Sequence, residues 1–184
     1  MTGERAAVIG LDGVPFELLG SFIDAGIMPN TAEIARRGTF VKMETALPAV
    51  SAVAWTSFIT GRNPGAHGIF GFTDLNGNEI SLKLPSFQDV KVPTFWDTLP
   101  GIESLIVNVP FTYPAVPTRG VMISGFVAPV FERAVYPQSL IPWLRAKNYR
   151  IDVDSVKGRS DRHGLIRELF ETLAVTEDVM LELV

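Results

Sequence analysis

A carboxylate and a hydroxyl stand where secondary-structure elements are expected to end and begin. Asp12 follows the apolar run Val8-Ile-Gly-Leu11, which predicts a buried strand, and Ser51 precedes the helical segment Ala52–Ile59. The start of a helix favours bound anions such as phosphate. A carboxylate can hold a divalent cation, which in turn can activate a hydroxyl. The pair therefore predicts a metal-activated serine that attacks phosphorus, with Asp12 and Ser51 as metal ligands.

Each residue also has a purely structural explanation. Asp12 could cap the helix expected after Pro15, and Ser51 could cap its own helix, an arrangement that stabilises a helix by about 1 kcal/mol. Ser51 is nevertheless the best placed of the nearby hydroxyls. The rivals lie within or at the end of the helix, or in the extended segment before it: Thr56, Ser57, Thr60 and Thr45.

The two histidines are expected to be structural or solvated rather than metal ligands. His67 lies in the turn Pro64-Gly-Ala-His67-Gly68, where a histidine more often bonds backbone carbonyls than a metal. His163 follows a polar, basic stretch and is expected at the surface. Phe70-Gly-Phe72 and Trp55 are expected to line the core or a pocket wall.

The elements that must position these residues alternate between strands and helices. Residues 71–92 are expected to form a loop or hairpin, with Asn76-Gly77 as its turn. The alternation predicts an α/β fold with a mainly parallel sheet, whose carboxyl edge would carry Asp12. Strands are expected at 8–12, 39–43, 104–109 and 121–124, and helices at 15–25, 31–35, 52–59, 94–99, 137–147 and 164–183.

Composition narrows the class of protein. The 184 residues are 47% hydrophobic and 20% charged, which fits a globular domain. A net charge of -4 without a basic run argues against a nucleic-acid partner. The sequence has no cysteine, which excludes disulfides and thiolate chemistry. It shows no signal-peptide pattern, and prolines interrupt its most apolar stretch, so a cytoplasmic protein without a membrane span is expected; its oligomeric state is left open.

These motifs occur in an order that resembles the alkaline phosphatase superfamily. They are Leu11-Asp12-Gly13, Gly26-Ile-Met-Pro29-Asn-Thr31, Ser51, and Thr60-Gly61-x-x-Pro64-x-x-His67-Gly68. Within that superfamily the sequence resembles the type I phosphodiesterase/nucleotide pyrophosphatase group and its predicted phosphohydrolase and phosphomutase relatives. Three further segments are similar to those relatives: Val92–Asp97, Asn108–Pro114 and Gly120–Phe126.

The resemblance implies a fold, a reaction and a cofactor. The fold is a three-layer α/β/α sandwich, and the cofactor is a pair of divalent metal ions, usually zinc. Asp12 matches a ligand of one metal, and Ser51 matches the nucleophile that also contacts metal. The implied reaction is hydrolysis of a small-molecule phosphate ester, either a diester or a monoester, through a phosphoserine.

The resemblance also implies ligands that these 184 residues lack, namely further aspartates and three histidines. Asp12 and Ser51 cannot fill a four-coordinate site alone. Residues 1–184 are therefore expected to be the N-terminal part of a single catalytic domain, incomplete and inactive by itself, with an excursion near 71–92. The alternatives are a phosphomutase of the same superfamily and a non-catalytic binding module that keeps the fold.

Overall fold

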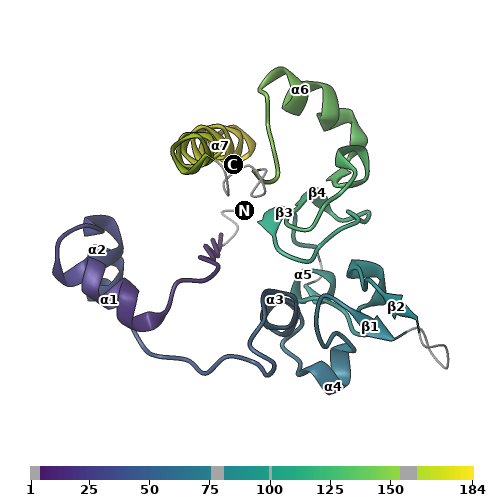
Figure 1. Cartoon of the computed structure of the whole chain (residues 1–184), viewed down its shortest axis with the longest axis horizontal. Coiled ribbons are helices and arrows are strands. Elements are labelled where there is room, and N and C mark those ends of the chain that lie inside the picture. The colour runs from purple at the N-terminus through teal and green to yellow at the C-terminus, as the bar shows by residue number, and fades with distance from the viewer. Residues whose placement is uncertain (1–4, 76–80, 100, 154–160) are drawn as a thin grey trace. The chain divides into compact units, whose positions relative to one another are not determined.

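The computed structural model describes residues 5–75, 81–99, 101–153 and 161–184, and Figure 1 shows their helices and strands. The chain divides into two compact units, Met1–Thr45 and Ala46–Val184, which are described separately below. Both helices and strands are present, as the predicted α/β class requires.

The first unit contains the helices α1 (Phe16–Asp24) and α2 (Pro29–Arg37). Both agree with the prediction to within two residues, and each follows or begins with a proline, whose fixed φ suits the start of a helix. The Phe16 ring stacks on Phe40 with a centroid distance of 4.5 Å.

The strands predicted at 8–12 and 39–43 are wrong for the structure described here. Residues 5–11 and 39–46 are neither helix nor strand, and the Val8 and Ile9 side chains are 62% and 80% exposed. An apolar run becomes a strand only when a neighbouring strand completes its hydrogen bonds. No described strand pairs with either segment, so hydrophobicity alone was insufficient for the prediction.

The second unit is built on a three-stranded sheet in the order β3-β4-β5. Strands β3 (Ser104–Val109) and β4 (Gly120–Ser124) confirm the predictions at 104–109 and 121–124, and they run parallel. Strand β5 (Val135–Tyr136) pairs with β4 in the antiparallel sense. The described sheet is therefore mixed, so the predicted mainly parallel sheet and three-layer sandwich are not confirmed.

Helical side chains pack against both faces of β4, because successive strand residues point to opposite sides. On one face, Met122 is fully buried in a cluster with Ile59 and Trp96. On the other face, Ile123 is fully buried with Leu144 and Val179.

The described part of this unit contains five helices. They are α3 (Ser51–Thr60), α4 (Pro64–His67), α5 (Phe95–Thr98), α6 (Ile141–Ala146) and α7 (Arg162–Leu183). Helices α3, α5 and α7 lie within two residues of their predicted positions, α6 begins four residues after its predicted start, and α4 forms where a tight turn was predicted. The described residues also form three short 3₁₀ turns: η1 (Phe87–Asp89) before α5, η2 (Phe131–Arg133) between β4 and β5, and η3 (Gln138–Leu140) before α6.

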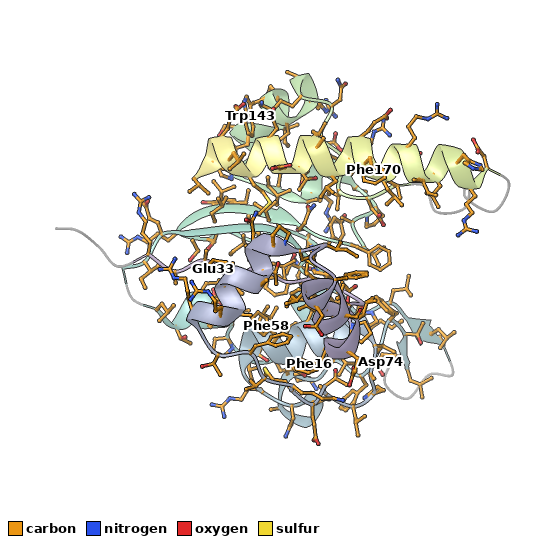
Figure 2. All side chains as sticks on the ribbon, turned by 90° about the vertical axis from the view of Figure 1, so that its left-hand side faces the viewer. Phe16, Glu33, Phe58, Asp74, Trp143 and Phe170 are labelled. Atoms are coloured by element: carbon orange, nitrogen blue, oxygen red, sulfur yellow. The ribbon has the colours of Figure 1, made fainter. Side chains whose placement is uncertain are left out.

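Helix α7 is anchored at one face and exposed at the other. Val179 is completely buried, whereas Phe170 on the same helix is 69% exposed; Figure 2 labels Phe170 together with Trp143 on α6. Lys147, at the end of α6, forms ion pairs with Asp178 and Glu182 of α7. Among the described helices, α7 included, none combines the length and the apolar character that a membrane crossing requires.

A short hairpin precedes the sheet. Strands β1 (Asp74–Leu75) and β2 (Leu82–Lys83) pair antiparallel, with Asp74 opposite Lys83. The predicted Asn76-Gly77 turn lies outside the described residues.

Candidate active site

Asp12 occupies a turn in the first unit. It follows residues 5–11, which are neither helix nor strand, and it is exposed. The residue that caps α1 is Pro15, in an extended conformation (φ -68°, ψ 152°) and without a side-chain hydrogen bond. The structure therefore gives no support to Asp12 as the cap of this helix, which was the structural alternative to a metal ligand.

Ser51 is the first residue of α3, not its cap. Val50 occupies the N-cap position with extended backbone (φ -128°, ψ 149°), and its carbonyl accepts from the amides of Val53 and Ala54, each at 3.0 Å. Ser51 is partly buried. It thus lies in the first turn of the helix, where backbone amides and the helix dipole favour an anion.

Helix α3 is fixed by one buried face. Ala52, Val53, Thr56 and Ile59 are buried at the three- and four-residue spacing of a helix. The Thr56 hydroxyl donates to the Ala52 carbonyl at 2.6 Å, so this polar side chain is satisfied inside the core. The Thr60 hydroxyl likewise donates to the Thr56 carbonyl at 2.6 Å, so the hydroxyls of both Thr56 and Thr60 bond the backbone of the helix.

The turn between α3 and α4 follows directly from its sequence. Gly61 ends α3 in the left-handed conformation (φ 61°), which costs a glycine no steric strain. The Asn63 side chain then caps α4 by accepting from the Ala66 amide at 3.2 Å. Pro64 provides the first helical residue, where its missing N–H is of no consequence.

His67 is fully buried, and both of its ring nitrogens have partners. Its Nδ1 accepts from the Ile69 amide at 3.1 Å, so the proton of the neutral ring lies on Nε2, which donates to the Ser57 Oγ at 3.0 Å. Burial lowers the pKa of the His67 imidazole below its ordinary value and so favours this neutral form. His67 is a structural residue, as predicted, although its ring bonds a backbone amide and a hydroxyl instead of backbone carbonyls.

The His67 ring also supports the start of α3. Ile69, whose amide donates to that ring, packs in one buried cluster with Ala52 and Phe111. Ala52 directly follows Ser51, and Phe111 lies just beyond the carboxyl end of β3. This cluster therefore places the first turn of α3 beside the loop that leaves β3, at the sheet edge where α/β proteins carry their sites.

The loops after β3 and β4 are joined by a dense set of hydrogen bonds. The Phe111 amide donates to the Phe126 carbonyl at 2.7 Å, and the Gly125 amide donates to the Val109 carbonyl at 3.1 Å. The buried Thr112 hydroxyl donates to the Val109 carbonyl at 2.7 Å and accepts from the Gly125 amide at 3.2 Å. A Cβ at Gly125 would lie 2.5 Å from the Val109 oxygen, so only glycine permits this approach.

The same sheet edge holds a polar pair of side chains. Asn108 interrupts the register of β3 and β4 and has a positive φ of 55°, a conformation that asparagine tolerates better than most residues. The Tyr149 hydroxyl donates to the Asn108 Oδ1 at 2.5 Å. Burial raises the pKa of the Tyr149 phenol, so this group stays protonated and keeps the Asn108 amide oriented.

Metal-binding side chains do not gather into a complete set in the described part of the chain. No group of three or more histidine, cysteine, aspartate or glutamate residues is found there. Both His67 ring nitrogens are engaged, and His163 is exposed in the first turn of α7, not in the loop that was predicted for it. Asp12 and Ser51 offer oxygen atoms of the type that binds divalent cations, but two such ligands do not complete a four-coordinate site.

The sequence model of the family described as type I phosphodiesterase / nucleotide pyrophosphatase matches residues 6–176. The match covers nearly the whole chain, from the segment before Asp12 through most of α7, and the chain belongs to this family. The coarse activity of the family is hydrolysis of phosphoric esters, in agreement with the predicted class. Comparisons with curated proteins and with solved structures found no significant match.

Sequence reasoning did not assign a role to the loops beyond β3 and β4. In the sequence, Asn108 and Thr112 lie in the segment Asn108–Pro114 that resembles related proteins, and Tyr149 lies outside the similar segments. The signal that points to the two loops is the clustering of aromatic, glycine and hydroxyl residues after the apolar strands β3 and β4, and it does not extend to Tyr149. Their contacts join residues that are distant in sequence, and hydrophobic periodicity contains no information about such contacts.

Proposed function

We propose that this protein is a metal-dependent phosphohydrolase in which Ser51 attacks the phosphorus of a small-molecule phosphate ester. The observation that carries the proposal is the position of Ser51 in the first turn of α3, within a chain of the phosphodiesterase family. The N-terminal turn of a helix attracts the phosphate, and the positive end of the helix dipole stabilises the negative charge that builds up during attack.

In the proposed reaction the Ser51 oxygen forms a bond to phosphorus as the ester P–O bond breaks. The leaving group departs as an alkoxide or phenoxide that takes up a proton, and water then attacks the phosphoserine and releases phosphate or a phosphomonoester. A divalent cation would supply the positive charge that makes a serine hydroxyl reactive near neutral pH. Asp12 is proposed as a ligand of this cation, which is expected to be zinc, one of two.

The remaining ligands are proposed to come from residues outside these 184, because two oxygen ligands are too few. In this proposal residues 8–12 join a larger, mainly parallel sheet of a three-layer α/β/α domain. The packing of helices on both faces of β4 supports this architecture. A cytoplasmic location and the absence of a nucleic-acid partner stay predictions.

The decisive experiment is to trap the phosphoenzyme in the complete protein. The protein, loaded with zinc, is mixed with bis(p-nitrophenyl) phosphate or p-nitrophenyl phosphate, quenched with acid and digested, and the phosphorylated peptide is mapped. We expect phosphate on the peptide that contains Ser51, loss of the label in Ser51→Ala, and loss of turnover after chelation with recovery on zinc addition. Turnover that survives Ser51→Ala would overturn the proposal.

Ser57→Ala is the matched control, because Ser57 is a second hydroxyl on the same helix and its oxygen is engaged with His67. This variant should still become phosphorylated at Ser51. Product analysis distinguishes the reaction classes, since a hydrolase releases inorganic phosphate or a monoester, whereas a mutase returns the phosphoryl group to another hydroxyl of the substrate.

A further inference from the structure

Helix α7 has two apolar faces, and the described residues cover only one of them. The inner face packs against the sheet through Val179, which is completely buried. The outer face carries large apolar side chains at the three- and four-residue spacing of one helical stripe, each between 43% and 69% exposed: Ile166, Leu169, Phe170 and Leu173. Figure 2 labels Phe170, the most exposed of them. A row of such side chains, unlike a single one, marks an interaction surface.

One charged residue stands at each end of this stripe. Arg162 lies four residues before Ile166, and Glu177 lies four residues after Leu173. Both therefore belong to the outer face, since residues four apart in a helix lie above one another. Both are exposed, and neither forms an ion pair with a residue in the ranges that the structure describes.

The helix by itself favours neither charge at its position. The Asp161 side chain caps α7 by accepting from the Gly164 amide at 2.8 Å, so Arg162 is the first helical residue. The helix dipole disfavours a cation in the first turn. Glu177 in turn places a carboxylate in line with an apolar stripe. Three other acidic residues of α7 form ion pairs within the chain, Glu168 with Arg150, and Asp178 and Glu182 with Lys147.

The spacing of the outer face is the same in both directions along the helix. From Arg162 to Glu177 the steps between its residues are four, three, one, three and four. A twofold axis between Leu169 and Phe170 therefore exchanges each apolar position with an apolar one, and the basic position with the acidic one. Two antiparallel copies of α7 related by this axis would form two Arg162–Glu177 pairs, one at each end. Parallel packing in register would place like charges opposite each other.

We propose that the outer face of α7 is a dimer interface, in which the helix packs antiparallel against α7 of a second copy of this chain. Burial of the apolar stripe supplies the attraction, and the two Arg162–Glu177 pairs set the direction and the register. The charge pattern favours a second copy as the partner, because a pattern that is complementary to itself about a twofold axis fits an identical helix. The inference concerns assembly and goes beyond the proposed function.

The test measures self-association of the complete protein by sedimentation velocity over a range of concentrations. The wild type should dimerise. Arg162→Glu and Glu177→Arg should each raise the dissociation constant about tenfold or more, because the twofold axis turns one substitution into two like-charge contacts. The double variant Arg162→Glu/Glu177→Arg should regain the wild-type affinity. Since about 22 Å separate the two positions along one helix, this rescue can arise only between two copies.

A mixture of the two single variants gives an independent result. One variant carries acidic side chains at both ends of the stripe, and the other carries basic side chains at both ends. Equal amounts of Arg162→Glu and Glu177→Arg should therefore form a heterodimer at concentrations where each variant alone is monomeric. Arg167→Glu is the matched control, because Arg167 is exposed on the same helix but lies about 140° around it from Arg162. This control should dimerise like the wild type.

Several outcomes would overturn the inference. They are a wild type that is monomeric at every concentration, a dimer that neither single variant weakens, a dimer that Arg167→Glu weakens equally, and a double variant or a mixture without rescue. If another part of the same chain covers the outer face instead, the single variants lose stability in urea and the double variant loses more, with no change in mass. That result would also show the proposed dimer to be wrong.

Discussion

Replacing His67 with leucine should destabilise the second unit while leaving its hydrophobic volume nearly intact. The ring is fully buried and serves as the acceptor for the Ile69 amide, at a residue that is itself 1% exposed. A buried amide that loses its acceptor costs about 1–3 kcal/mol. Ser57 is only partly buried and can turn to water, so its lost bond adds about 1 kcal/mol. We expect a loss of about 2–4 kcal/mol in the free energy of unfolding, measured by urea titration at pH 8.

The pH dependence of the same variant tests the cause. Because burial lowers the pKa of His67 in the folded state, the unfolded chain binds a proton at a higher pH than the folded chain does. The His67 contribution is therefore complete above the ordinary histidine pKa of about 6.5 and is lost as the pH falls below it. His67→Leu removes this dependence, so the stability difference between wild type and variant should shrink from pH 8 to pH 5.

His163→Leu is the matched control, because the chain has two histidines and this one is exposed in α7. It should change the stability by less than about 0.5 kcal/mol at every pH. Stability curves of wild type and His67→Leu that run parallel between pH 8 and pH 5 would refute the burial argument. A small loss at pH 8 would refute the role of His67 as an acceptor for the Ile69 amide.

Two further substitutions test the packing and the loops of the second unit. Val179→Ala removes buried methyl groups between α7 and β4 and should lower the free energy of unfolding in urea by about 2 kcal/mol. Leu181→Ala is the control on the same helix, and it should cost far less because Leu181 is 72% exposed. Equal losses in the two variants would contradict the observed buried face of α7. Thr112→Val keeps the side-chain shape but loses both hydrogen bonds of the hydroxyl, and it should lower the free energy of unfolding by about 1–3 kcal/mol. Thr98→Val, at an exposed threonine, is the control. Hydrogen exchange at the Gly125 amide should become faster in Thr112→Val, and an unchanged rate would show that packing alone holds the two loops.

The elements of the second unit could be predicted because their signals are local. Helix α5, predicted at 94–99, has Thr94 as its N-cap, and Asp97 accepts from both the amide and the hydroxyl of Thr94, at 3.0 and 2.6 Å. This reciprocal capping depends on residues only three apart, so it can be recognised from a four-residue segment of the sequence. The strand of residues 104–109 was likewise specified by a continuous run of β-branched and apolar side chains.

The strand predicted at 8–12 is absent from the described structure because a strand needs the hydrogen bonds of a partner that is remote in the sequence. The run before Asp12 has the composition of a buried strand, yet no described strand completes its hydrogen bonds, and its side chains are exposed. The antiparallel pairing of β5 with β4 could not be predicted from the sequence either, since a two-residue strand shows no periodicity. The order and sense of strands depend on partners that are remote along the chain, and this is why the mixed sheet could not be foreseen.

The candidate site shows the same division between local and remote information. The residue types at Asp12 and Ser51 were sufficient to suggest the chemistry, but helix caps explained both residues equally well from sequence alone. The structure assigns those cap positions to Pro15 and Val50. N-capping therefore does not account for Ser51 in this structure, and its role as a nucleophile stays a prediction that phosphopeptide mapping can test.

His67 shows how a buried residue of a motif can stabilise the fold around a candidate site. Its imidazole fixes Ile69, Ile69 packs against Ala52 and Phe111, and these contacts hold the first turn of α3 against the loop that leaves β3. A substitution at His67 should therefore disturb both the helix that carries Ser51 and the loop that carries Phe111. Loss of phosphoester turnover in His67→Leu would then reflect displaced groups, and the Ser51 phosphoenzyme, once formed, should still be found on the same peptide.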